Sequence, residues 1–252
     1  MVTQSIEVRE EDGVRTLHFG SHWIQGAMRV ARPYALELEY TREMLFPLLL
    51  RKDSGWPRRV LQIGLGAASL VKFLHRHRPQ AMQTIVEIDP AVVQAARQFF
   101  KLPDDRDHLA IEVGDGDAWV ANSRATFDLI LVDAFDAKGR SGRVDLFPFY
   151  RNARGRLSRD GVLAVNYLTR GRGFAKRLEH LAEAFDGRVC TLPASVNGNV
   201  IALATAGDRI ECSWAELGAS ARALKRDTGL NLLPTLARLV QAEAGGGDCF
   251  VI

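Results

Sequence analysis

The sequence predicts an α/β protein built on an open, mostly parallel β-sheet, and three observations lead to this prediction. From residue 59 to residue 185, short apolar runs alternate with helix-length segments, as in strands joined by crossover helices. The first run enters a turn that contains glycines, and the next three runs end on acidic residues. Because ligands of open parallel sheets bind beyond the carboxyl ends of the strands, these residues are expected to meet at one crevice. They are Gly64 and Gly66, Glu87, Asp115 and Asp133.

A small β unit is expected at the start of the chain. Asp12-Gly13 separates two short runs, residues 6–10 and 14–19, and an Asp-Gly pair between such runs is a hairpin signal. Residues 23–30 supply a further short strand. These segments predict an antiparallel unit that precedes the main sheet.

Residues 36–50 have the apolar spacing of a helix, and the breaker segment 53–57 follows them directly. We therefore expect a domain boundary at residue 50. Residues 1–50 would form the small N-terminal β unit with its connecting helix, and residues 51–252 the main domain.

The main domain is expected to alternate strands and helices, with right-handed crossovers between parallel strands. The alternation stops after residue 185, because the connection 193–199 is too short for a crossover helix. The two strands that flank this connection are therefore expected to form an antiparallel hairpin at the sheet edge. The expected strands are 59–63, 83–88, 109–113, 127–132, 161–168, 188–192 and 200–205, and the expected helices are 66–77, 90–101, 116–122, 146–157, 173–185, 213–226 and 230–244.

The composition is that of an ordinary globular protein. The chain has 252 residues, 47% of them hydrophobic and 25% charged, which is enough for one full core with an appendage. No apolar run approaches the ~20 residues that a membrane-spanning helix needs, and residues 1–11 lack the features of a signal peptide. A cytoplasmic protein without a membrane partner is expected. The spacing of Cys190, Cys212 and Cys249 indicates neither a disulfide framework nor a metal site.

Basic residues are concentrated between residues 137 and 177, which carry eleven Lys or Arg against Asp145 and Asp160. This segment is compatible with a solvated helix face or with a nucleic-acid surface. The first interpretation is favoured because aromatic side chains, on which bases stack, are not interleaved with the cations. A nucleic-acid partner is therefore not expected.

The glycine turn and the acid after the next strand indicate a nucleoside site. At Gly64 and Gly66 the missing β-carbon allows a ligand to approach the backbone, and the following helix N-terminus offers free N–H groups. Glu87 is placed to accept hydrogen bonds from both ribose hydroxyls, a feature of dinucleotide and S-adenosyl cofactors alike. Glycine turns also serve packing, and a strand-end carboxylate can simply be exposed. Ser69 stands at the third position of the dinucleotide fingerprint, which argues against NAD.

Asp115 distinguishes between these two cofactor classes. An acid that ends the third strand and precedes Gly116 can accept a hydrogen bond from the adenine amino group of a mononucleoside cofactor. A dinucleotide fingerprint makes no such demand. Gly114-Asp115-Gly116 alone would be only a turn, so the argument depends on its order after Gly64 and Glu87. An S-adenosyl-type nucleoside is favoured over NAD.

The motifs together resemble those of the spermidine synthase (polyamine aminopropyltransferase) family, and most of all its short bacterial spermidine-synthase-like members. The similarity covers about residues 15 to 205. The motifs are Gln62-Ile63-Gly64-Leu65-Gly66, Val86-Glu87-Ile88-Asp89-Pro90, Gly114-Asp115-Gly116, the segment from Asp128 to Asp136, Gln25, and Tyr40-Thr41-Arg42-Glu43-Met44, which has one residue more than the family's Tyr-x-Glu-Met helix.

The resemblance implies a fold, a reaction and a set of roles. The fold would be the S-adenosylmethionine-methyltransferase-like Rossmann fold, with a seven-stranded, mostly parallel sheet and an antiparallel edge hairpin, in a homodimer. An amine would attack the carbon next to the sulfonium of decarboxylated S-adenosylmethionine and release methylthioadenosine. By the same resemblance, the cofactor contacts would be Gln25, Gly64, Gly66, Glu87, Asp115 and Gly116, the catalytic acids Asp133 and Asp136, and the acceptor contacts Tyr40 and Asp136.

Two departures from the family pattern keep other functions open. Ala67 stands where the family has an Asp that engages the amine of the decarboxylated donor, and its small side chain leaves room for the carboxylate of intact S-adenosylmethionine. Lys138, Arg140 and Arg143 follow Asp136, beside a path meant for a polycationic amine. An S-adenosylmethionine-dependent methyltransferase is therefore the alternative enzyme. A catalytically degenerate nucleoside-binding protein is the non-enzymatic one.

Overall fold

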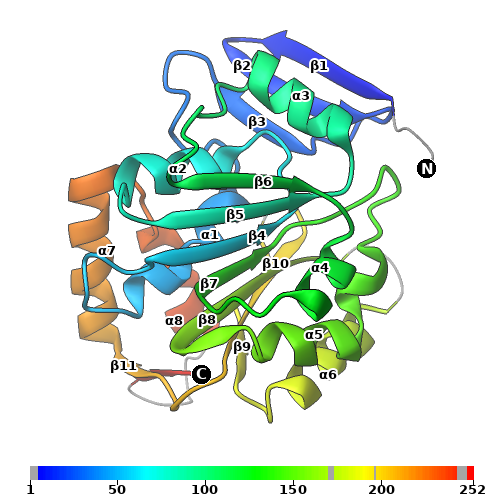
Figure 1. Ribbon diagram of the computed structural model, residues 1–252. Helices are drawn as coiled ribbons and strands as arrows, with labels where there is room; N and C mark the ends of the chain where they lie inside the picture. The colour runs from blue at the N-terminus through cyan, green and yellow to red at the C-terminus, as the bar shows by residue number, and fades with distance from the viewer. Residues whose placement is uncertain (1–4, 170–172, 196, 243–248) are drawn as a thin grey trace.

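The computed structural model describes residues 5–169, 173–195, 197–242 and 249–252. Within these ranges, seven strands form the central sheet in the order β6-β5-β4-β7-β8-β10-β9 (Figure 1). The first five are parallel, and β10 is antiparallel to both of its neighbours. The predicted fold class, with its antiparallel edge hairpin, is confirmed. The strands are β4 (Arg59–Ile63), β5 (Met82–Glu87), β6 (Leu109–Val113), β7 (Phe127–Val132), β8 (Leu157–Leu168), β9 (Val189–Thr191) and β10 (Asn199–Thr205).

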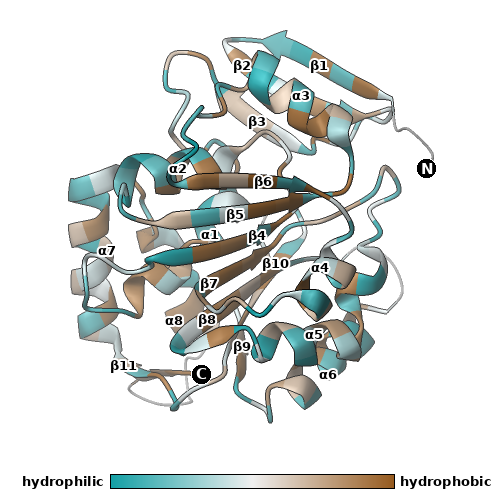
Figure 2. Cartoon of the chain, viewed as in Figure 1, coloured by the Kyte–Doolittle hydropathy of each residue, from teal (hydrophilic) through white to brown (hydrophobic). Residues whose placement is uncertain are grey.

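Helices cover both faces of this sheet, and the strands alternate their side chains between the two. On β7, Leu129 and Leu131 pack into the cluster that contains α7 and α8, whereas Ile130 and Val132 pack into the cluster that contains α5 and α6. Burial on both faces explains why β7 is apolar from Leu129 to Val132, and the central strands are mainly brown in Figure 2. The helices are α2 (Ser69–His77), α3 (Pro90–Phe99), α4 (Gly116–Asn122), α5 (Phe147–Arg154), α6 (Phe174–Ala184), α7 (Trp214–Thr228) and α8 (Leu233–Ala242), with the 3₁₀ turn η2 (Gly142–Asp145).

The N-terminal unit is an antiparallel sheet of β1 (Ile6–Glu11), β2 (Val14–Phe19) and β3 (Gly26–Arg29) among the described residues. The predicted turn at Asp12-Gly13 joins the first two strands, and both residues have positive φ. This sheet packs against α2 and α3 at the β6 side of the molecule (Figure 1). It thereby lies beside the glycine turn that follows β4.

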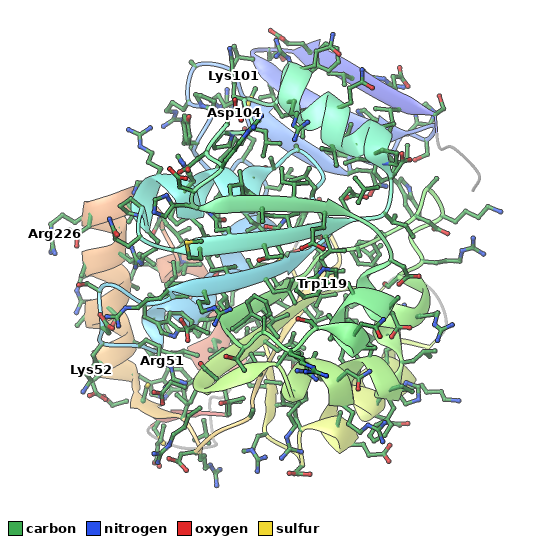
Figure 3. The ribbon with its side chains drawn as sticks, in the orientation of Figure 1. Arg51, Lys52, Lys101, Asp104, Trp119 and Arg226 are labelled. Carbon is green, nitrogen blue, oxygen red and sulfur yellow. The ribbon has the colours of Figure 1, made fainter. Side chains whose placement is uncertain are left out.

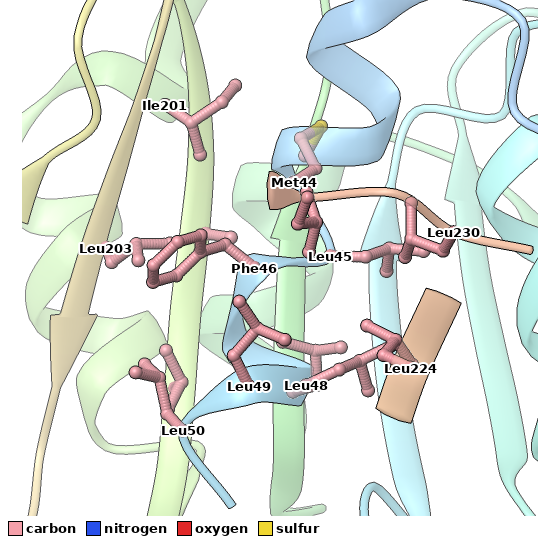
Figure 4. Close-up of a cluster of buried hydrophobic side chains, with 14 of the residues drawn as sticks. Met44, Leu45, Phe46, Leu48, Leu49, Leu50, Ile201, Leu203, Leu224 and Leu230 are labelled. Carbon is pink, nitrogen blue, oxygen red and sulfur yellow. The ribbon is translucent and has the colours of Figure 1, made fainter. Parts of the chain in front are cut away.

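The helix predicted over residues 36–50 is wrong as a single element. It is replaced by α1 (Glu39–Glu43) and the 3₁₀ turn η1 (Phe46–Leu49). Pro47 has no backbone N–H to continue an α-helix, so the chain changes to a tighter turn there. Leu45, Phe46 and Leu49 are buried against β10 and α7, as Figure 4 shows.

Two short elements at the end of the chain were not predicted. β11 (Glu211–Ser213) pairs antiparallel with β12 (Cys249–Val251), and Phe250 packs on Phe46 and Trp214.

In α1, the buried carboxylate of Glu43 contacts Arg238 and Thr235 of α8. These contacts tie α1, which carries Tyr40, to the C-terminal helices.

Candidate functional site

A cavity of about 830 Å³ opens at the carboxyl ends of the parallel strands. This volume lies in the usual range for small-molecule sites, roughly 300–1,000 Å³. Every site residue expected from the sequence lines it. They are Gln25, Tyr40, Gly64, Gly66, Glu87, Asp115, Gly116, Asp133 and Asp136.

The glycine turn after β4 packs directly on the end of β7. Gly64 has φ +91°, and a β-carbon there would lie 2.1 Å from the backbone oxygen of Asp133. Gly66 has φ +52°, and a β-carbon there would lie 3.2 Å from the backbone oxygen of Gln25. Only glycine combines these close approaches with these backbone angles. The turn therefore holds Asp133 and Gln25 on either side of one loop.

Glu87 is a buried carboxylate that organises this loop. Its Oε2 accepts a hydrogen bond from Leu65 N at 2.8 Å, and its Oε1 accepts one from Asp89 N at 3.0 Å. Burial raises the pKa of Glu87, although hydrogen bonds from the backbone N–H groups of Asp89, Leu65 and Ile88 act in the opposite direction. A carboxylate has about four acceptor sites, so Glu87 retains acceptor capacity for a ligand in the cavity.

Asp115 caps the N-terminus of α4. Its Oδ1 accepts hydrogen bonds from Asp117 N at 2.8 Å and Ala118 N at 3.3 Å. Both bonds use the same oxygen, and the residue lines the cavity. Gly116 packs on β4, since a β-carbon there would lie 2.5 Å from Ile63 Cγ2. Asp115 can therefore cap α4 with its Oδ1 and contact a ligand in the cavity with its Oδ2.

Asp133 receives side-chain hydrogen bonds from two different elements. Asn166 of β8 donates to its Oδ1 at 2.9 Å, and Tyr40 of α1 also hydrogen-bonds the carboxyl group. Asn199 of β10 in turn donates to Asn166 Oδ1 at 2.9 Å, so the Asn166 amide presents its Nδ2 to Asp133. Burial raises the pKa of Asp133, and the bonds from Asn166 and Tyr40 oppose this rise.

Asp136 lies on the loop after β7 and is paired with Arg140. Arg140 Nη2 lies 2.7 Å from Asp136 Oδ2, and the backbone N–H groups of Lys138 and Arg140 donate to Oδ1. Burial acts to raise the pKa of Asp136, but the hydrogen bonds from Arg140 and Lys138 outweigh it and lower the pKa. Asp136 is therefore an ionised carboxylate whose charge is balanced by a neighbour on the same loop.

Sequence reasoning missed the two asparagines, although one signal pointed to them. Asn166 is the lone polar residue in the apolar run from Val162 to Leu168, apart from the hydroxyl of Tyr167. A buried amide in such a strand needs partners, and Asn199 and Asp133 supply them. Trp23 and His22, between β2 and β3, also line the cavity.

Ala67 and Trp119 lie outside the lining of this cavity as far as the chain is described. Ala67 is buried against β3, since a β-carbon on Gly26 would lie 2.6 Å from the Ala67 Cβ. Trp119 packs on Phe127 and donates to Glu112 Oε2 at 2.5 Å. Figure 3 shows Trp119 in the region of α4, and it shows Arg226 on the opposite side, at α7.

Two further findings concern ligands and membranes. No group of three or more His, Cys, Asp or Glu side chains is arranged to hold a metal ion within the described ranges. Within the same ranges, no helix is long and apolar enough to cross a membrane.

Comparisons with known proteins identify the family. Residues 39–167 match the model of the spermine/spermidine synthase domain. The polyamine aminopropyltransferase of Chromobacterium violaceum is 35% identical over 238 residues, which cover 94% of this chain and 90% of that protein.

Solved structures share the fold. A probable spermidine synthase from Corynebacterium glutamicum aligns with a TM-score of 0.72 at 20% identity, over 98% of this chain and 86% of that one. Human methyltransferase-like protein 13, solved with SAH, aligns with a TM-score of 0.69 at 24% identity, over 76% of this chain and 93% of that one. With the family model and the curated relative together, the chain belongs to the spermine/spermidine synthase family.

Proposed function

We propose that this protein is an aminopropyltransferase, which transfers an aminopropyl group from decarboxylated S-adenosylmethionine to an amine. The observation that carries this proposal is the partly buried carboxylate of Asp133, fixed by Asn166 and Tyr40 in the cavity that Glu87 and Asp115 also line. The family and the name of the Chromobacterium violaceum relative support the same reaction class.

The nucleoside would occupy the side of the cavity formed by the glycine turn. Glu87 would accept the ribose hydroxyls with its remaining acceptor sites, and Asp115 with Gly116 would contact adenine. Gln25, whose backbone lies against Gly66, would complete the nucleoside contacts. The sulfonium carbon would then face Asp133 at the end of β7.

In the transfer step, the lone pair of the amine nitrogen forms a bond to the carbon attached to sulfur. The carbon–sulfur bond breaks, and sulfur keeps its electron pair as the thioether of methylthioadenosine. Because an alkyl ammonium has a pKa of roughly 10, the acceptor gives up one proton before its lone pair attacks, and Asp133 is the proposed group that takes this proton. Asp133 suits this step because burial raises its pKa and makes it a better proton acceptor than an exposed carboxylate.

Tyr40 and Asp136 are the proposed contacts of the acceptor. Tyr40 touches the cavity from α1 and hydrogen-bonds Asp133, so it would help to orient the attacking nitrogen. Asp136 contributes through the loop that it organises with Arg140. By the resemblance to the family we also propose a homodimeric assembly in the cytoplasm.

Methyl transfer from intact S-adenosylmethionine is the second candidate, favoured by one observation. Ala67 replaces the family's donor-binding Asp and is buried against Gly26, so no acid at this position repels a donor carboxylate. Cations that line the cavity, such as Lys138, are compatible with that carboxylate.

Product analysis separates the candidates. The purified protein is incubated with either donor and a panel of primary amines, and the nucleoside product is identified by chromatography. Methylthioadenosine from the decarboxylated donor is expected, with turnover reduced at least roughly 100-fold in Asp133→Asn while donor affinity is retained. S-adenosylhomocysteine from the intact donor would instead establish a methyltransferase. Absence of both products would leave a binding protein.

A further inference from the structure

Arg238 of α8 bridges two carboxylates of the short helix α1. Its Nη1 donates to Glu39 Oε1 at 2.9 Å, and its Nη2 contacts Glu43 Oε1. Thr235, which precedes Arg238 by one turn of α8, donates its Oγ1 to the same Glu43 oxygen at 3.1 Å. The side chain of Glu43 is 0% exposed and that of Arg238 is 31% exposed. The bridge is thus largely shielded from water, where the loss of one ionic partner is costly.

Helix α1 depends on contacts with other elements for its orientation. It has five residues, far fewer than an isolated helix needs to be stable. The side chains of Thr41 and Arg42 hydrogen-bond only locally, to backbone oxygens of residues 36–38. Glu39 and Glu43 are four residues apart and therefore lie on one face of α1. One guanidinium group that holds both of them fixes the rotation of α1 about its axis.

Tyr40 lies on this helix between the two acids and reaches the cavity. It lines the cavity and hydrogen-bonds the carboxyl group of Asp133. Besides burial, which raises the pKa of Asp133, the groups that act on this pKa are Asn166 and Tyr40, and the hydrogen bonds from both lower it. Asn166 is fixed within the sheet by Asn199. The place of the Tyr40 hydroxyl is set instead by α1, and so by Arg238.

We propose that Arg238 is a positioning residue for the reaction, and that it acts on Asp133 through Tyr40. The inference rests on the proposed aminopropyl transfer, in which Asp133 takes a proton from the amine. While Arg238 holds α1, the Tyr40 hydroxyl donates to the Asp133 carboxylate and stabilises its ionised form. Without the bridge, α1 is free to rotate, and this hydrogen bond weakens.

The test follows kcat/KM against pH with decarboxylated S-adenosylmethionine and the amine that product analysis identifies. In Arg238→Gln the acidic limb should move to higher pH by about half a unit, and kcat should fall roughly tenfold. Tyr40→Phe should move the limb in the same direction. In the double variant the two shifts should not add, because both substitutions break the same hydrogen bond. An unmoved acidic limb in Arg238→Gln, or additive shifts in the double variant, would overturn the proposal.

Thr235→Val is the matched control, because it removes a hydrogen bond from the same Glu43 oxygen but leaves the bridge from Arg238 to both acids. Urea unfolding should show a loss of stability in this variant. Its acidic limb should move by less than half the shift of Arg238→Gln. Equal shifts in the two variants would show that lost stability, and not lost orientation, is the cause.

Folding of the main variant is checked by circular dichroism. Burial raises the pKa of Glu43, so this carboxylate can take up a proton once its cation is gone, which limits the cost of Arg238→Gln. If Arg238→Gln does not fold, Arg238→Lys keeps the charge but loses the planar fork that reaches both acids. A smaller shift in the same direction is then expected, and an unmoved limb would overturn the proposal.

The failure of this inference and that of the proposed function are distinguishable. An NMR titration of carboxyl-labelled aspartate measures the pKa of Asp133 without turnover, and the spectrum of Asp133→Asn identifies the resonance. This pKa should be higher in Arg238→Gln than in the wild type. Equal values would overturn the role of Arg238 and leave the aminopropyltransferase intact. Absence of methylthioadenosine from the wild type with the whole panel of amines would overturn the proposed function, and with it the role of Arg238 in that reaction.

Discussion

The Asp133 carboxylate draws its properties from residues distant in the sequence. Asn166 donates to it from β8, and Asn199 of β10 fixes which end of the Asn166 amide faces it. If the Asn166 amide were flipped by 180°, its Oδ1 would face a carboxylate oxygen of Asp133. Both atoms are hydrogen-bond acceptors, so this arrangement would be unfavourable for the ionised carboxylate. The pair of asparagines therefore favours the ionised, proton-accepting form of Asp133.

Asn166→Ala should raise the pKa of Asp133, because the bond that Asn166 donates lowers it. A base acts when it is deprotonated, so the acidic limb of the profile of kcat/KM against pH should move to higher pH. Loss of positioning should also lower kcat roughly 10- to 100-fold. Asn122→Ala is the control, since Asn122 donates only to Ala118 O within α4. An unshifted acidic limb in Asn166→Ala would contradict this assignment.

Glu87→Gln should weaken methylthioadenosine binding roughly 10- to 100-fold, the effect of losing a hydrogen bond to a charged group. An amide group cannot accept from Leu65 N and Asp89 N and still offer two acceptors to a ribose. Calorimetry measures the change, with Glu112→Gln as the control because Glu112 is exposed on β6. Equal affinities of wild type and Glu87→Gln would remove Glu87 from the nucleoside site.

Residues at strand ends could be placed from the sequence because the topology fixes where those ends lie. Glu87, Asp115 and Asp133 follow consecutive parallel strands, so a correct fold class brings them to one cavity. The hydrogen-bond and ion-pair partners of the side chains in this cavity could not be predicted from the sequence. The pairing of Asp136 with Arg140 depends on the loop conformation, and the contact of Asn166 with Asn199 depends on the pairing of β8 with β10.

At the level of elements, α2 carries a buried cation that the site does not use. Lys72 is 1% exposed, and its Nζ donates to Phe100 O at 2.8 Å. Burial lowers the pKa of Lys72 to about 7. In the unfolded chain the pKa would be roughly 10.4. Between these values the unfolded state binds more protons, so this group makes the folded state more stable as the pH rises.

Lys72→Met should therefore increase the free energy of unfolding by about 2–4 kcal/mol at pH 6.5. The gain should shrink as the pH rises toward 9, where the wild-type lysine is already neutral in the folded state. Urea unfolding at the two pH values measures it, and Lys225→Met, at an exposed position of α7, is the control. A gain in the free energy of unfolding that does not change with pH would show that burial does not lower the pKa of Lys72.

The elements themselves could be predicted to different extents. The central strands of the main sheet were predicted well because burial on both faces makes most of their residues apolar, as in β7 from Leu129 to Val132. The helix over residues 36–50 was overextended, because its apolar spacing continues past Pro47. β11 and β12 are three residues each, and their pairing joins segments far apart in the sequence, so no local pattern indicates them.

For the whole molecule, the cavity is formed jointly by the central sheet, α1 and the N-terminal unit. Tyr40 enters from α1, which Arg238 and Thr235 of α8 hold in place through Glu43. Trp23 and Gln25 enter from the N-terminal unit, which contacts the glycine turn through Gly26 and Ala67. We therefore expect substitutions at the contacts of Glu43 with α8, or at the contact of Gly26 with Ala67, to alter catalysis as well as stability.

A crystal structure of the protein with bound methylthioadenosine tests the assignment of Glu87, Asp115 and Asp133 to one nucleoside site. We predict that the ribose hydroxyls contact Glu87, that adenine lies beside Asp115 and Gly116, and that the sulfur is directed toward Asp133. A nucleoside bound elsewhere on the protein, or bound in this cavity with its sulfur directed away from Asp133, would contradict it.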